Sequence, residues 1–405
     1  MKASALLLMP LLAIGLAGCG TPRTLIPPMT TTSAPPASPA VATIEPDPKA
    51  DPSPEMSFGM FKAKTAYDSG RYEQALEFFD EALSEEEALP KPRWRQVGYI
   101  RYALGRTLQK MDRHEAASEH FKAVLAIVLR HLGPHHLSVV DCHVQIAREY
   151  NRRGDFAAQQ KHILAALPIW LQHYGPTSNP VLIAFGDLGG SYLAIGDFKR
   201  ALSFHQAQLG IALVLQGAEG KDIPVMFSNL AQILAKQGEH LKAMEFMEKS
   251  MALGIKIHGE QHSQMGLIIC NMAKLYMHRP EPDLKKANAL LARAEAILKT
   301  DDPTGNRRFN YLRVRGNLLL AEKQYQKALR VHEEHLAGTL KLGFAADHPH
   351  LARTQYLIGV AHQGLGQESE AKRLFHRAHA IQIRTLLPTH PHLLESKAAL
   401  AKMGE

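Results

Sequence analysis

The stretch Gly196-Asp197-Phe198-Lys199-Arg200-Ala201 decides the fold, because versions of it recur along the chain. Gly70, Gly154, Gly196 and Gly238 fall on a grid with a spacing of 42 residues, and Asp112 occupies the one node without a glycine. Later copies drift by one or two residues. A fixed period of this length is typical of stacked supersecondary units, each of which buries its apolar face against its neighbours.

The residue twelve positions before the end of this phrase (Ala201 in the quoted copy) is always small. With a two-residue insertion allowed in one copy, these positions are Ala63, Gly105, Ala147, Gly189, Ala231, Ala273, Gly316 and Gly359. After the phrase, pairs such as Phe79 and Ala82 lie on one helix face. The sequence therefore predicts repeats of one helix (A), a short glycine turn and a second helix (B). An irregular helical domain would not keep a small residue at one phase eight times.

This pattern resembles the tetratricopeptide repeat, whose small, aromatic and alanine positions are matched by Gly189, Tyr192 and Ala201. The repeat is longer than the usual period of about 34 residues, and in this it resembles the kinesin-light-chain type. The resemblance implies an all-α fold, a right-handed superhelical solenoid of about eight helix hairpins. It covers residues 58–387, and a capping helix is expected over 388–405.

The composition is that of a soluble globular protein, with 45% apolar and 21% charged residues and a net charge of +8. These values exclude a multi-span membrane protein, a collagen and a fully disordered chain. The chain has no Gly-x-Ser-x-Gly motif, phosphate loop or dinucleotide fingerprint. We therefore predict that the protein is not an enzyme and uses no cofactor.

Histidine and cysteine offer the remaining candidates for chemistry. His332 and His335 share a helix face, and their positions in helix B favour packing over a metal site, which stays the alternative. The His-Pro-His phrases at 348–350 and 390–392 are also interpreted as repeats of one loop, with a metal site as the alternative. Cys142 and Cys270 are predicted to be buried free thiols on A helices.

Residues 1–18 have the features of a signal peptide, with a basic start and a short apolar run. The run ends in Leu16-Ala17-Gly18-Cys19, which resembles a bacterial lipobox. The resemblance implies cleavage before Cys19, diacylglyceryl attachment to its thiol and acylation of its new amine. Gly20, rather than Asp, at the next position favours the outer membrane, facing the periplasm. An ordinary secretory signal with a chance cysteine is the alternative.

Residues 19–57 are predicted to join the lipidated cysteine to the folded part. Ten of the 24 prolines lie at 20–57, together with many small polar residues. Such a segment has too few large apolar side chains to form a core, so we expect a disordered, proline-rich tether.

The side of helix A opposite its packing stripe carries most of the candidate binding residues. Cations recur eleven and seven positions before the end of the repeated phrase, with two tyrosines and an asparagine on neighbouring positions. The predicted groove residues are Lys64, Tyr99, Tyr102, Arg106, Lys110, Arg148, Asn151 and Arg152, and the same positions hold Lys236 and Lys274 later. Because A helices line the concave face in the resembled family, we expect a basic groove. A solvated basic face is the alternative.

The resemblance implies binding of proteins or peptides. The carboxylate clamp of some relatives is absent, because Tyr102 and Arg106 stand where that clamp has lysine and asparagine. We predict a membrane-tethered scaffold that binds a periplasmic or outer-membrane protein, or an acidic peptide, in assembly of a secretion or pilus system. The alternative is an anionic polysaccharide or cell-wall glycan in an export complex. Nucleic acid is not an expected partner, because the protein is predicted to be exported.

Overall fold

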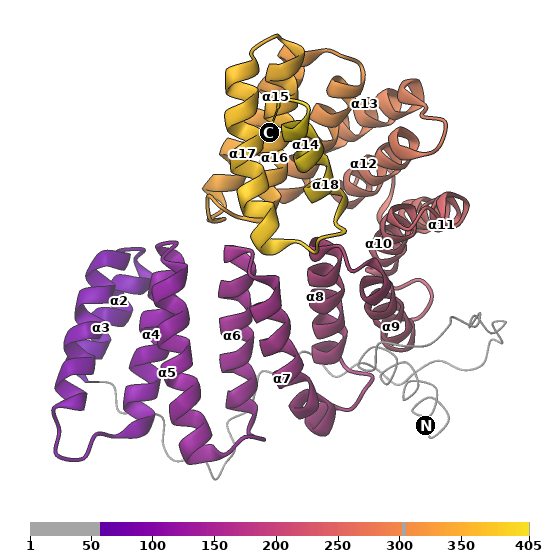
Figure 1. Ribbon diagram of the computed structural model, residues 1–405. Coiled ribbons are helices and arrows are strands. Elements are labelled where there is room, and N and C mark those ends of the chain that lie inside the picture. The colour runs from indigo at the N-terminus through magenta and orange to yellow at the C-terminus, as the bar shows by residue number, and fades with distance from the viewer. Residues whose placement is uncertain (1–56, 302–304, 405) are drawn as a thin grey trace. The chain divides into compact units, whose positions relative to one another are not determined.

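The computed structural model describes residues 57–301 and 305–404, all of whose regular elements are helices (Figure 1). The predicted signal peptide, Cys19 and the predicted tether up to residue 56 lie outside the described residues, and Ser57 caps the first described helix. The chain divides into two compact units, Met1–Cys142 and His143–Glu405. Among the described residues, no helix is long and apolar enough to cross a membrane.

The described helices form eight hairpins and a last single helix. The first unit holds α2 (Phe58–Asp68), α3 (Tyr72–Glu87), α4 (Trp94–Lys110) and α5 (His114–Leu132), and α6 (Leu137–Arg153) runs across the boundary. The second unit continues with α7 (Phe156–Tyr174), α8 (Asn179–Ile195), α9 (Phe198–Gln216), α10 (Ile223–Lys236), α11 (His240–His258), α12 (Ser263–His278), α13 (Leu284–Asp301), α14 (Asn306–Ala321), α15 (Tyr325–Lys341), α16 (Pro349–Gly364), α17 (Glu368–Thr385) and α18 (Pro391–Ala401). The predicted all-α stack of hairpins is confirmed, with the even-numbered helices α2–α16 as A helices.

Aromatic and histidine rings of the B helices pack against the small residues of the A helices, as the repeat phase predicts. A Cβ atom added to Gly105 would lie 2.7 Å from Phe121, and one added to Gly189 would lie 2.7 Å from His205. Gly316 faces His332 in the same way, at 2.5 Å. Each glycine therefore makes room for the ring four positions after the end of the phrase. This close approach joins each hairpin into one packing unit.

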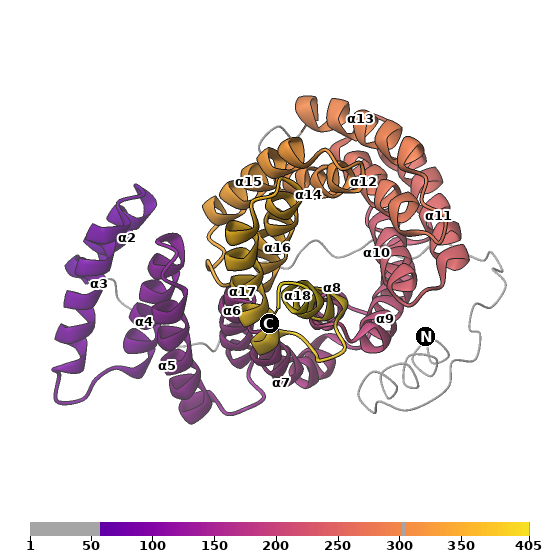
Figure 2. The same ribbon diagram turned by 45° about the horizontal axis from the view of Figure 1, so that its top comes forward.

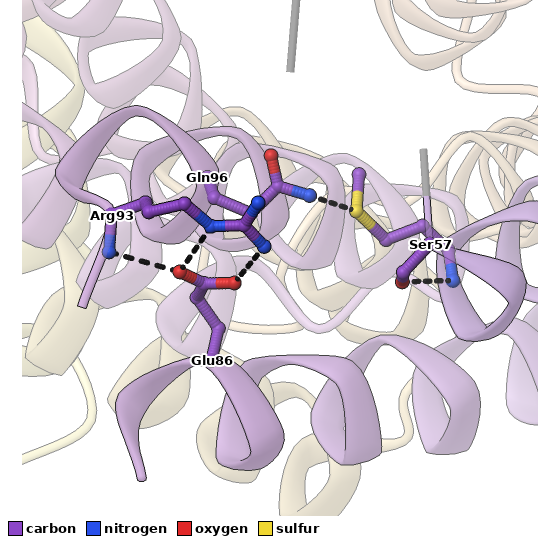
Figure 3. Close-up of polar contacts among 5 residues, drawn as sticks. Ser57, Glu86, Arg93 and Gln96 are labelled. Atoms are coloured by element: carbon purple, nitrogen blue, oxygen red, sulfur yellow. Dashed lines mark hydrogen bonds and ion pairs between the residues drawn. The ribbon is translucent and has the colours of Figure 1, made fainter. Parts of the chain in front are cut away.

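A buried carboxylate ties the first two hairpins together (Figure 3). Glu86, near the end of α3, accepts hydrogen bonds from the backbone amide of Arg93 at 2.9 Å and from its guanidinium at 2.7 and 3.0 Å. The nearby Gln96 amide donates to the sulfur of Met60, so α4 is also linked to α2. The guanidinium beside Glu86 lowers the pKa of this carboxyl and keeps it ionised.

In the second unit, the A helices form an inner row and the B helices an outer row (Figure 2). Helices α10, α12, α14 and α16 pack on one another in succession, in addition to packing on their B helices. In a curved stack of hairpins, the helices of the inner row lie closer together than those of the outer row. The side of the inner row that faces away from the B helices is therefore the concave surface of the stack. We call this side of the A helices of the second unit the inner surface.

The second unit also closes on itself, because its last repeats contact its first. Leu342 accepts a hydrogen bond at 2.8 Å from the guanidinium of Arg152, and the Leu387 amide donates to the Ile195 carbonyl at 3.0 Å. The sequence separation of Arg152 and Leu342 is 190 residues. The loops before α16 and α18 thus lie against the glycine turns after α6 and α8.

Both closing loops contain a His-Pro-His phrase, and in both the first histidine caps the helix that follows. His348 Nε2 donates to the Asn151 carbonyl at 3.0 Å, while its Nδ1 accepts from the backbone amide of His350 at 3.1 Å. His390 caps α18 similarly, accepting from the amide of His392 at 3.0 Å. We call His348 and His390 the closing histidines. The phrases therefore have a structural role beyond that of repeated loops.

The glycine turns leave room for these histidines. At Gly154, which has a φ of +73°, an added Cβ would lie 2.1 Å from Pro349. At Gly196, with a φ of +92°, it would lie 2.6 Å from His390. A side chain at either turn would displace the closing loop as well as strain the backbone.

Candidate functional site

The predicted groove residues divide between the two units. In the first unit, Lys64 of α2 is exposed and forms an ion pair with Asp68 at 2.6 Å, which raises the pKa of the lysine. Tyr102 of α4 meets Phe121 edge to face, so its ring belongs to the packing between α4 and α5. The other three, Tyr99, Arg106 and Lys110, lie on α4 with partly or largely exposed side chains.

The last turns of α6 carry Arg148, Asn151 and Arg152, which belong to the second unit. Arg148 is exposed and acts on the carboxyl of Asp187 in α8, partly offsetting the rise in its pKa that burial causes. Asn151 and Arg152 take part in the closing contacts through the Asn151 carbonyl and the Arg152 guanidinium. Two of the three residues therefore have a structural partner that the sequence did not reveal.

Four cations converge on the inner surface of the second unit. Lys236 ends α10, Lys274 lies in α12, Arg313 in α14 and Arg353 in α16, so each comes from a different A helix. Lys274 donates to Gln232 at 3.4 Å, and Arg313 donates to Asn310 at 2.6 Å. We call Lys236, Lys274, Arg313 and Arg353 the inner cation cluster.

Burial and the neighbouring cations lower the pKa values of Lys236, Lys274 and Arg313. Burial lowers the pKa of Lys274 well below its ordinary value, and Arg313, Lys236 and Arg353 lower it further. Burial and Arg353 lower the pKa of Lys236, although its side chain keeps contact with solvent. Since Lys274 responds to cations from three other helices, the four charges share one region.

A single carboxylate partly balances this charge. Glu395 of α18 forms an ion pair with Arg353, and it also raises the pKa of Lys236, although less than burial lowers it. Among the described residues, Lys236, Lys274 and Arg313 form no ion pair. The cluster thus holds four cations against one anion, and three of the cations are partly buried, so that water screens their charges less than at an open surface.

Arg313 and Arg353 were not among the predicted site residues, although the sequence contains their signal. Arg313 lies fifteen positions before Ala328, and Arg353 lies eighteen positions before Ala371. The predicted groove residues Tyr102 and Tyr99 occupy these same two positions, fifteen and eighteen before Ala117. Extending that stripe to the last repeats would have found them.

The two candidate histidines of α15 are core residues. His332 is 0% exposed and packs beneath Gly316, and His335 Nδ1 lies 3.1 Å from the Thr354 hydroxyl. Burial lowers their pKa values to about 3 and about 4. In the part of the chain that is described, no group of three or more histidine, cysteine or acidic side chains could hold a metal ion. Cys142 and Cys270 are buried and free, as predicted.

Comparisons with known proteins identify the repeat. Models of the tetratricopeptide repeat match residues 60–130, 184–219, 226–264 and 351–392. No curated protein sequence matches the chain.

Three solved structures are similar to the chain, and the first two, with TM-scores above 0.5, share its fold. A tetratricopeptide repeat protein from Parabacteroides merdae is 14% identical, with a TM-score of 0.53, over 75% of this chain and 97% of that one. The apo form of the quorum sensor NprR from B. thuringiensis is 13% identical, with a TM-score of 0.52, over 80% and 87%. A kinesin light chain from Podosopora anserina, whose own TPR-like repeats are nearly identical to one another, is similar as well. It is 19% identical to this chain, with a TM-score of 0.42, over 48% of this chain and 93% of that one.

Proposed function

The chain is built from tetratricopeptide repeats, and on that premise we propose that it is a non-catalytic scaffold that binds an anionic segment of a partner protein. The inner surface of the second unit is the binding surface in this proposal. The observation that carries it is the inner cation cluster, with four cations from four helices and one carboxylate.

An excess of partly buried cations lowers the stability of the folded protein when no anionic ligand is bound. Exposed lysines cost little, but Lys274 and Arg313 lie where burial disfavours their charged forms. A ligand with carboxylates would supply the missing negative charge, and its association would be accelerated by the positive field. This supports an acidic peptide segment as the ligand.

We further propose that the protein is anchored in the outer membrane through acylated Cys19 and faces the periplasm. Two or three acyl chains anchor a protein firmly, whereas one holds it only marginally. Residues 20–57 would then let the repeats reach a partner away from the bilayer, in assembly of a secretion or pilus system.

The anchor is tested by Cys19→Ala. The variant should leave the membrane fraction and appear in the soluble periplasmic fraction. Retention in washed membranes at the wild-type level would refute lipid anchoring.

The binding surface is tested by cross-linking in cells followed by mass spectrometry. Lys236→Glu with Arg313→Gln should reduce the yield of cross-linked partner at least tenfold. Lys199→Glu with Arg377→Gln, on the exposed faces of α9 and α17, makes the same change in charge and should leave the yield unchanged. Equal yields from both pairs, with intact helices by circular dichroism, would refute the inner surface as the binding site.

The same experiment tests the residues predicted from the first repeats. Arg106→Glu with Arg148→Glu should also weaken capture if the partner extends along those A helices. A separate binding assay with purified anionic polysaccharide tests the alternative ligand. If the wild-type chain retains the polysaccharide and binds no protein partner, and the variant with Lys236→Glu and Arg313→Gln loses the polysaccharide, the polysaccharide alternative is correct.

A further inference from the structure

The inner cation cluster has more donors than acceptors. Lys274 has a long contact with the uncharged Gln232, and Arg313 donates to the amide oxygen of Asn310. The amide nitrogen of Asn310 is itself buried, with no hydrogen-bond partner in the described chain. Buried donors normally have an acceptor, so this region lacks one.

The arrangement differs from a ladder along an extended peptide. Helices α10, α12, α14 and α16 pack on one another in succession around the inner row (Figure 2), and each contributes one cation of the cluster. The positive charge of Arg353 also lowers the pKa values of Lys236 and Lys274, which lie on other helices of the row. Because four successive helices of a curved row each contribute one cation to its concave side, the four side chains face a common region. Such a region suits one compact anion better than a row of separated ones.

The charge and the donor types indicate which anion. With Glu395 included, the cluster has three more positive than negative charges. A single carboxylate has one charge and two oxygens, whereas a phosphate monoester carries about two charges and presents three acceptor oxygens. Two guanidinium groups and two ammonium groups match that pattern, because arginine forks pair with phosphate oxygens and lysine binds phosphate as a point charge.

We propose that Lys236, Lys274, Arg313 and Arg353, with the amide of Asn310, form a binding site for a dianionic phosphate group, either inorganic phosphate or a phosphomonoester. The site deepens the proposed function by naming the anion that the inner surface recognises most strongly. It also assigns Glu395 a role as the internal anion that holds Arg353 in place beside the ligand.

Calorimetric titration of the purified full chain with inorganic phosphate, at constant ionic strength set with chloride, tests the site. We expect one site per chain with a millimolar or tighter dissociation constant. Lys274→Met and Arg313→Gln should each weaken binding at least tenfold, while Lys199→Met and Arg377→Gln should change it less than twofold. Lys236→Gln, at an exposed side chain, serves as the variant that is safest for folding and should weaken binding about threefold or more.

Two further ligands separate the possible sources of the phosphate. Glycerol 3-phosphate should bind as well as inorganic phosphate if the site accepts an esterified group, and markedly worse if it selects the free ion. Either result supports the site. A phosphodiester, which has one charge, should bind at least tenfold more weakly than either.

The proposal is overturned if phosphate does not bind, or if all five variants bind it equally. It is also overturned if a dicarboxylate such as succinate binds as tightly as phosphate, because the cluster would then be a carboxylate site. In that last case, or if phosphate fails while cross-linking still depends on Lys236 and Arg313, the proposed scaffold function stands without the phosphate site.

Discussion

Lys64 and Lys274 occupy the same position of the repeat in the two units, and their environments are opposite. Lys64 is exposed, and its pair with Asp68 raises its pKa. Lys274 is recessed among cations, and burial lowers its pKa well below the ordinary value. The repeat position therefore decides which face a side chain lies on, but closure of the second unit decides what surrounds it.

The largest effect that we expect concerns acid and the closing histidines. Burial lowers the pKa values of His348 and His390 to about 4 in the folded protein, from an ordinary value of 6.5. The unfolded chain therefore binds more protons between these values. The stability that the two histidines contribute is complete above pH about 6.5 and is lost as the pH falls toward 4, by about 1.4 kcal/mol per pH unit for each.

Urea denaturation at several pH values between 7 and 4 measures this loss. His348→Asn with His390→Asn keeps a capping acceptor at both positions but removes the titration. The double variant should be less stable at pH 7 and should lose less stability on acidification. Parallel pH profiles for the variant and the wild type would show that the closing histidines do not control the acid response.

The next effect concerns the glycine turns. Gly154→Ala places a Cβ against Pro349, whereas Gly238→Ala, at a similar φ of +82°, meets nothing within 4 Å. Both substitutions cost about 1 kcal/mol for the left-handed backbone, and the first adds about 1–3 kcal/mol for steric overlap with the closing loop. Chemical denaturation should show this difference. Equal losses of stability in the two variants would mean that the closing loop moves away from the added Cβ atom without cost.

A smaller effect of opposite sign is expected at Lys274. In buffer without multivalent anions, Lys274→Met should raise the free energy of unfolding by about 1 kcal/mol, because an unpaired recessed charge is replaced by an apolar side chain. Lys64→Met should leave stability unchanged, because exposed ion pairs contribute little. If Lys274→Met destabilises the protein in such buffer, Lys274 has a favourable partner and the cluster is not short of anions.

The smallest expected effect is a gain in stability at two turns, one in each unit, and it should be of similar size in both. Asp112 and Lys323 have positive φ values of 55° and 58° at turns where most other repeats have glycine. Asp112→Gly and Lys323→Gly should each stabilise the protein by about 0.5–1 kcal/mol, because glycine adopts this conformation without a steric penalty. Thermal denaturation of the single variants measures the gain, and a loss at either site would indicate that its side chain is needed there.

The helix hairpins could be predicted from the sequence because their packing is local and repeated. Each small residue of an A helix and each ring four positions after the phrase lie within about one repeat of each other, as Gly189 and His205 do. The position of the inner surface follows from the same phase. Periodicity alone is enough to predict these features of the fold.

Closure of the second unit could not be predicted in this way. It brings Arg152 to Leu342 and Asn151 to His348 across more than four repeats, and it depends on small rotations accumulated at each repeat. The phrases that make the contacts, at 348–350 and 390–392, were visible in the sequence. Nothing in their spacing indicated that they would meet the turns at Gly154 and Gly196.

The most direct test of the contrast between the units is a titration of the two lysines. Reductive methylation with ¹³C-labelled formaldehyde gives each lysine of the full chain an NMR signal, and Lys64→Arg and Lys274→Arg variants assign the two signals. In buffer without phosphate, Lys274 should titrate well below 10.5 and Lys64 above it. If both titrate together near 10.5, Lys274 is not recessed among cations, and the inner cation cluster does not exist as described.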